Sequence, residues 1–219
     1  MAVDDKFLKE TFYLDFNAPE LAAHLDKAVS DAQTDEERIA DWYLYVRDAW
    51  RYNPYNIYLT PEKLRVSDIV QRKECHCIDK SLIFIAGLRK MGIPARLHLA
   101  KVCNHISADR IKEKLGTDEL APHGYAAVHH NGQWTKASPI FDRNLCRFLN
   151  VDPLEYDGTE DAIFQEYDKA GGMFMEYLED YGHYDDLPLQ RMKDIMKEVY
   201  PHMVDRFIKV IEAGEPLSF

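Results

Sequence analysis

Two cysteines flank a histidine at Cys75-His76-Cys77, and the dense apolar run "LIFIAGL" begins a few residues later at Leu82. The run predicts a buried helix over residues 77–91, which Gly92 stops. A cysteine at the start of a helix lies beside unpaired N–H groups and the positive end of the helix dipole, and both favour the thiolate. Cys77 is therefore predicted to be a nucleophile. Cys75 lies in the approach to the helix, and His76 is given no role.

A nucleophilic thiol usually works with a histidine that takes up its proton and later returns it. Among nine histidines, His123 is the best candidate, because it follows a proline at the mouth of a predicted hairpin that turns at residues 131–132. This turn makes the numbers of paired residues sum to 263, so His123 faces Ile140 and has Ser138 as a diagonal neighbour. Ser138 is therefore predicted to orient the imidazole. Asp142 follows on the same face and could replace it if the chain bends.

A metal site is the competing interpretation of these residue types. It would use Cys75, His76, Cys77, Cys103 and His105, but this spacing is unusual for structural zinc, and we predict neither a metal nor a cofactor. A disulfide between Cys75 and Cys77 would close a tight, strained ring. Four cysteines are also too few for a disulfide scaffold of 219 residues. We therefore expect reduced thiols in a cytoplasmic protein.

The elements that must position these residues begin with a short N-terminal strand and a helix that starts at Asn17. A second helix starts at Thr34, where Glu37 stands at the spacing of a capping box. Alternating residues predict a strand over 95–103, and a polar helix is expected near 107–116. Together with the cysteine helix and the hairpin, these elements predict an α+β fold.

The chain changes character after Pro139, becoming acidic and aromatic with little strand alternation. The Met and Tyr residues of "GGMFMEYLEDYGHY" are expected to be core residues at helical spacing. The stretch 188–212 predicts an amphipathic helix interrupted at Pro201. We therefore predict a core domain over residues 1–149 and a helical C-terminal extension over residues 150–219.

The overall charge excludes some classes of partner. With 38 acidic and 27 basic residues, the formal net charge is -11, which repels nucleic acid and anionic membrane surfaces. The N-terminus lacks the pattern of a signal peptide, and no apolar run is long enough to span a membrane. A 46% hydrophobic content is ample for a buried core.

Two stretches together resemble the transglutaminase-like superfamily of papain-fold cysteine enzymes. They are "CHCIDKSLIFIAGLRKMGIPAR" and "HGYAAVHHNGQWTKASP", and the resemblance extends over about residues 37–142. It implies a papain-like core in which the cysteine helix packs on an antiparallel sheet. Cys77 then matches the nucleophile, Asp79 the acid at the helix start, and His123 the general base. Trp134 matches a tryptophan of the second strand.

The sequence departs from the family pattern at three positions. The third catalytic residue of the family, an aspartate before proline, falls on Ser138. A serine hydroxyl can fix the imidazole tautomer, but it cannot stabilise an imidazolium as a carboxylate does. Cys75 stands where glycine is usual, and Tyr125 stands where tryptophan is common.

The leading interpretation is a cysteine-dependent hydrolase or acyltransferase that acts on an amide of a peptide or protein through a thioester on Cys77. The catalytic set would be Cys77, His123 and Ser138. The Cys77 N–H, with Tyr52 or Asn53 in "RYNPY", is a candidate for binding the oxyanion. Hydrolysis is preferred over protein crosslinking, because nothing resembles the extra domains or calcium sites of crosslinking enzymes. The alternative is an inactive module that keeps the fold to bind a peptide.

Overall fold

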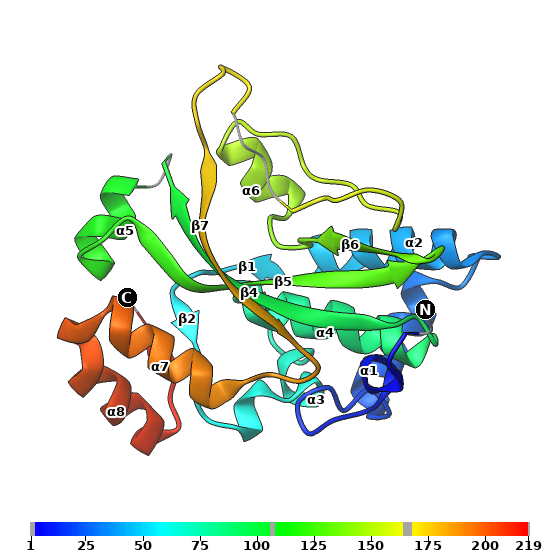
Figure 1. The fold of residues 1–219 in the computed structure, drawn as a ribbon, viewed down its shortest axis with the longest axis horizontal. Helices are drawn as coiled ribbons and strands as arrows, with labels where there is room; N and C mark the ends of the chain where they lie inside the picture. Colours follow the sequence, from blue (N-terminus) through cyan, green and yellow to red (C-terminus); the bar gives the residue numbers. More distant parts are fainter. Residues whose placement is uncertain (1–2, 106–107, 164–167, 219) are drawn as a thin grey trace.

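A four-stranded antiparallel sheet in the order β6-β5-β4-β7 forms the centre of the molecule. The computed structural model describes residues 3–105, 108–163 and 168–218. The strands of this sheet are β4 (Ala95–Asn104), β5 (Glu119–His130), β6 (Gln133–Ala137) and β7 (Met175–Tyr184). Figure 1 shows β5 and β4 crossing the middle of the molecule, with β7 beside β4.

Helices and short strands surround the sheet. The helices are η1 (Asp5–Leu8), α1 (Pro19–Ala28), α2 (Asp35–Ala49), η2 (Glu62–Leu64), α3 (Val66–Ile69), α4 (Cys77–Lys90), α5 (Ala108–Leu115), α6 (Arg143–Phe148), α7 (Leu189–Val199), η3 (Pro201–Met203) and α8 (Val204–Ala213). The parallel pair β1 (Arg51–Tyr52) and β3 (Glu74–Cys75) leads into α4. The antiparallel pair β2 (Asn56–Ile57) and β8 (Leu217–Ser218) joins the C-terminal part to the segment after β1.

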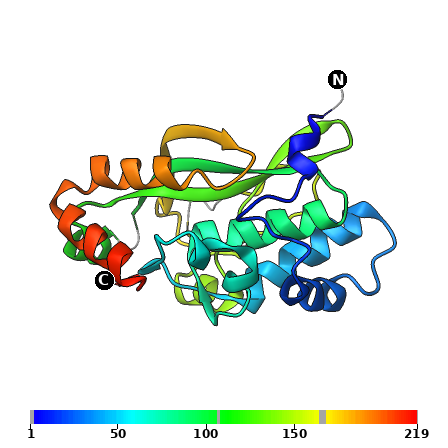
Figure 2. The ribbon, with the colours of Figure 1, turned by 90° about the horizontal axis from the view of Figure 1, so that it is seen from below.

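Helix α4 is the central helix, and all of its residues except Lys90 are buried. It packs closely against β5, because Gly124 has no side chain at the contact. A Cβ atom on Gly124 would lie 2.7 Å from Cγ1 of Ile78 and 3.1 Å from its Cα. Figure 2 shows the sheet between α4 on one side and α7 on the other. The predicted cysteine helix on an antiparallel sheet is confirmed.

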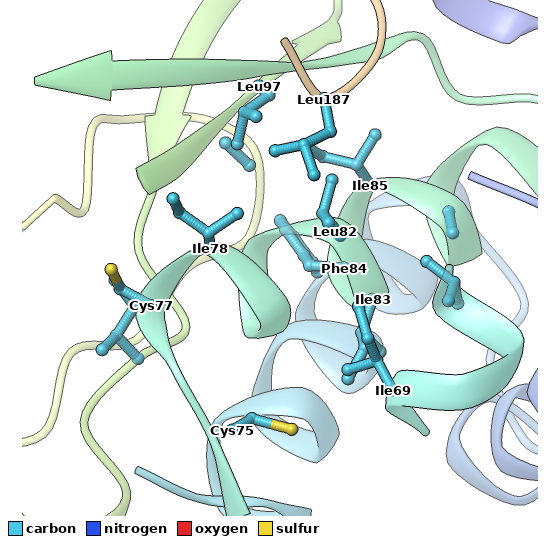
Figure 3. Packing of buried hydrophobic residues seen from close by; sticks show 14 of the residues in the cluster. Ile69, Cys75, Cys77, Ile78, Leu82, Ile83, Phe84, Ile85, Leu97 and Leu187 are labelled. Atoms are coloured by element: carbon cyan, nitrogen blue, oxygen red, sulfur yellow. The ribbon is translucent and has the colours of Figure 1, made fainter. Parts of the chain in front are cut away.

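The core around α4 is largely apolar, but it also contains buried cations, among them Lys80. Ile78, Leu82 and Phe84 pack inside it (Figure 3). Lys80 is fully buried, and its Nζ donates hydrogen bonds to the carbonyl oxygens of Arg47 (2.7 Å), Trp50 (2.9 Å) and Ile140 (2.8 Å). Burial lowers the pKa of Lys80 to about 8. Its ammonium group thus joins the end of α2 to the segment after β6, using all three of its donors.

Several local predictions are confirmed. Thr34 caps α2, and Glu37 completes the capping box. The hairpin turns at residues 131–132 with a positive φ at both, and Ala126 pairs with Ala137 in the predicted register. The end of the chain forms α7 and α8, separated by η3 at Pro201. Each of these features follows from residues close together in the sequence.

The expectation that residues 150–219 are helical is wrong for the stretch 175–184. This stretch forms β7, which pairs with β4 along the edge of the central sheet. Its burial does not alternate, because the strand lies at an edge and most of its side chains are exposed or half-buried. The predicted N-terminal strand is also wrong, since residues 5–8 form the 3₁₀ helix η1.

Candidate active site

Cys77 is the first residue of α4, as predicted. Asp79 stabilises this helix start, because its carboxylate accepts a hydrogen bond from the His76 N–H at 3.0 Å. The thiol itself is buried, with 2% of Cys77 exposed. Burial raises the pKa of Cys77 to about 12, although hydrogen bonds from the backbone N–H groups of Gly124 and Ile78 act in the opposite direction. The thiol is therefore neutral at pH 7, so the helix start does not outweigh the burial.

His76 lies beside the thiol, although the sequence analysis gave it no role. Both of its ring nitrogens are 3.5 Å from Sγ of Cys77. Burial lowers the pKa of His76 to about 3, with a smaller contribution from the nearby His123. Direct adjacency to the nucleophile at the N-cap of α4 was the one sequence signal that could have identified it.

His123 lies on β5, opposite Ala100 of β4. Its ring faces the edge of Tyr177 at a centroid distance of 6.4 Å. Within the described part of the chain, the imidazole makes no hydrogen bond. Burial lowers the pKa of His123 to about 4. The imidazole is thus neutral at pH 7, the form that can accept a proton.

Cys77, His76 and His123 line one cavity of about 30 Å³. The remaining walls come from four parts of the chain: the segment around β1 and β2, the end of α5, the start of β5, and α7 with the residue that follows it. They are Tyr52, Pro54, Ile57, Leu115, Leu120, Ala121, Pro122, Met192, Met196 and Tyr200. Side chains of the C-terminal part therefore line the same cavity as the buried thiol. Nothing in the sequence near α7 indicated this contact.

Ser138 shares a smaller cavity of about 10 Å³ with His123. The Ser138 backbone is hydrogen-bonded elsewhere, since its N–H donates to Ala162 and its carbonyl accepts from the Tyr43 hydroxyl. No hydrogen bond joins Ser138 to His123 among the described residues. Its role as the orienting residue therefore stays a prediction.

Asp142 is held in another role. One of its carboxylate oxygens accepts from the N–H groups of Asn144 and Leu145, capping α6, and the other accepts from the Tyr52 N–H at 3.3 Å. These three bonds orient the carboxylate toward the backbone of α6 and β1. In this structure Asp142 fixes Tyr52 in place.

The two candidates for binding the oxyanion, Tyr52 and Asn53, differ in which of their hydrogen-bond donors are already used. The Asn53 N–H donates to the Cys75 carbonyl, and the Asn53 side-chain amide donates to Glu74. The Tyr52 N–H is bonded to Asp142, but its side chain lines the Cys77 cavity. Burial raises the pKa of Tyr52 well above its ordinary value, and Cys77 adds to the effect. The Tyr52 hydroxyl is therefore a neutral donor near the thiol.

The other cysteines lie apart from this cavity. All four cysteines are buried and none takes part in a disulfide, and the sulfur atoms of Cys75 and Cys77 point in different directions (Figure 3). Cys103 lies 3.9 Å from the ring of His105, on the far part of β4.

Among the described residues, no group of three or more His, Cys, Asp and Glu side chains is arranged to hold a metal ion. No helix in the same ranges is long and apolar enough to cross a membrane.

Comparison with known proteins gives one family match. The family model described as the transglutaminase-like superfamily matches residues 23–139. No curated protein matches the sequence. Among solved structures, the chain is similar to a candidate cysteine protease from Cytophaga hutchinsonii, with 14% identity and a TM-score of 0.48. That similarity covers 85% of this chain and 48% of the other, so the chain spans about half the length of that protein.

Proposed function

The chain belongs to the transglutaminase-like superfamily, and on this basis we propose that it transfers or hydrolyses acyl groups through a thioester on Cys77. The observation that carries the proposal is the shared cavity of Cys77 and His123, with the thiol at the first residue of a helix. In the proposed catalytic set, His123 is the base, Ser138 orients it, and the substrate is an amide of a peptide or protein.

The neutral state of both side chains determines the form of the first step. His123 accepts the thiol proton while the Cys77 sulfur attacks the carbonyl carbon and the C–S bond forms. The Cys77 N–H and the Tyr52 hydroxyl are the proposed donors to the oxyanion. The C–N bond then breaks, and the imidazolium gives its proton to the leaving amine. Water or a second amine attacks the thioester, and the thiol is regenerated.

An activated ester tests this proposal before the natural substrate is known. With p-nitrophenyl acetate, we expect a burst of p-nitrophenol and a protein mass increased by one acetyl group on Cys77. Cys77→Ala should lose both signals, and His123→Gln should slow the burst by about 100-fold to 10,000-fold. Cys103→Ala is the matched control, because it removes another buried cysteine outside the cavity. A burst of full size in Cys77→Ala would refute the proposal.

The alternative is a peptide-binding module without catalysis. Ser138 at the position of the family acid and the covered thiol favour it. Such a protein would give no burst and no acetyl group on Cys77, although it would remain folded. The acetylation experiment therefore separates the two functions in one measurement.

A further inference from the structure

A second and larger cavity, of about 230 Å³, begins at His123 and extends away from the thiol. Its walls are the segment 52–55, Asn104, Leu120, Met175 and four apolar side chains of the segment 141–149. We call this cavity the α6 groove, because α6 and its flanking residues form one wall. Most of that wall and Met175 lie outside the region that matches the family model. The groove is thus built jointly by the matched region and by the part of the chain that follows it.

The α6 groove adjoins the Cys77 cavity. Tyr52, Pro54, Leu120 and His123 line both, whereas Cys77 lines only the smaller one. A group bound in the groove would therefore lie on the His123 side of the thiol. In the proposed reaction, His123 gives a proton to the leaving amine or takes one from the attacking amine. The groove consequently lies where the amine part of the substrate is held.

The lining of the groove selects for an apolar side chain. None of its described lining residues is Asp, Glu, Lys or Arg, so a charged side chain would lose its hydration without gaining a partner. The ring of Phe141 packs edge-on against the ring of Tyr52 at a centroid distance of 5.2 Å, and it packs against the tilted ring of Phe174 at 5.6 Å. These contacts fix an aromatic floor, because each ring is held by another.

Phe148 forms an exposed apolar rim at the end of α6. It is 83% exposed, more than any other large apolar residue of the described chain. Leu145 and Leu149 lie beside it and are half-buried in the wall of the groove. An aromatic residue left in water at the mouth of an apolar cavity is typical of a surface that a ligand covers.

We infer that the α6 groove binds the bulky apolar side chain, aromatic by preference, of the amine that leaves the carbonyl carbon when the thioester on Cys77 forms, or of the amine that attacks this thioester. The inference rests on the proposed function. In the attacking direction, the amine nitrogen forms a C–N bond with the thioester carbon and the C–S bond breaks. One proton passes from the amine through His123 to the sulfur, so the thiol is restored and no other reactant is needed.

Partition of the acetyl enzyme between water and added amines measures this preference. The protein is acetylated with p-nitrophenyl acetate, and the acetylated products of phenylalaninamide, glycinamide and glutamic acid α-amide are quantified by mass spectrometry. Phenylalaninamide should react at least about tenfold faster than glycinamide, because burial of one phenyl side chain increases the affinity about tenfold or more. Glutamic acid α-amide should react no faster than glycinamide.

Two substitutions link the preference to the groove. Leu145→Glu and Phe148→Glu place a charge in the wall and at the rim, and both should reduce the phenylalaninamide preference about tenfold or to none. Ile208→Glu is the matched control, since Ile208 is an exposed apolar residue on α8 outside the groove. It should leave the preference unchanged. Thermal unfolding and the acetylation rate of Cys77 report whether each variant keeps its fold and its thiol.

The results separate this inference from the function on which it rests. If Cys77 is never acetylated, the proposed function fails, and the inference fails with it. If Cys77 is acetylated but the amines react equally, the charged amine is preferred, or only water reacts, the inference alone is overturned. An aromatic preference that survives in both Leu145→Glu and Phe148→Glu would also overturn it.

Discussion

The covered thiol makes a quantitative prediction about the alkylation of Cys77. Burial raises the pKa of Cys77 to about 12, and the neutral His123 beside it supplies no positive charge at pH 7. The thiolate content at neutral pH is therefore lower than that of an exposed cysteine by a factor on the order of a thousand. Iodoacetamide reacts with the thiolate, so we expect alkylation of Cys77 to be slower by at least that factor.

The pH profile carries more information than the rate at one pH. As long as nearly all of the protein holds Cys77 as a thiol, the thiolate population rises tenfold per pH unit. The same pH dependence is expected whether iodoacetamide enters the closed cavity or reacts while the cavity is transiently open. In both cases nearly all of the protein holds Cys77 as a buried thiol, and the thiolate is formed from that population. We expect the rate to rise tenfold per unit from pH 6 to pH 10 without a plateau. An exposed cysteine approaches a plateau above its pKa of about 8.5.

Mass spectrometry of the peptide that spans residues 74–80 gives the rate for each cysteine. Fragment ions that separate Cys75 from Cys77 assign the modification, and the same peptide in urea gives the reference rate of an unfolded thiol. A plateau near neutral pH in the folded protein would mean that a thiolate and an imidazolium already exist at rest. That result would refute the neutral pair, and with it the transfer of the thiol proton to His123 during the attack.

Three further predictions concern the residues around the site. Lys80→Met leaves three buried carbonyl oxygens without their donor, and urea unfolding should show a loss of about 3 kcal/mol; an unchanged midpoint would contradict the role of this cation. Gly124→Ala places a Cβ atom 2.7 Å from the Ile78 side chain. We therefore expect the free energy of unfolding to fall by about 1–3 kcal/mol and the acetylation of Cys77 to slow by about tenfold or more. Wild-type values of both would contradict the close packing. Ser138→Asp brings a carboxylate to the cavity of His123 and should raise the pKa of that imidazole by about 1–3 units in an NMR titration; a value that stays near 4 would show that the two side chains do not interact.

Local signals in the sequence were sufficient for much of the fold. The capping box at Thr34 and the turn at residues 131–132 depend on backbone geometry that a few neighbouring residues determine. The start of α4 at Cys77 follows in the same way, because the apolar run requires a buried helix. These elements bring Cys77 and His123 to one cavity, so the pair could be nominated without a structure.

The C-terminal part could not be predicted in the same way. Strand β7 carries Glu, Asp and Tyr on an exposed edge, and its conformation is set by pairing with β4 about 80 residues earlier. Met192, Met196 and Tyr200 reach the Cys77 cavity from more than 100 residues away. The expected low pKa of the thiol depended on access to water, and the thiol is buried in a cavity that these distant side chains help to line.

The relation between His123 and Ser138 depends on where the hairpin ends. Extrapolating the register beyond the turn assumed that β6 continues past Ala137, but the ladder with β5 stops at the pair Ala126 and Ala137. The Ser138 N–H then turns to the Ala162 carbonyl, and Asp142 turns to cap α6. Beyond the last pair of a strand ladder, the register no longer predicts which residue lies opposite which. The orientation of His123 is therefore decided by packing around a small cavity, so a substitution at position 138 tests it more directly than any pattern in the sequence.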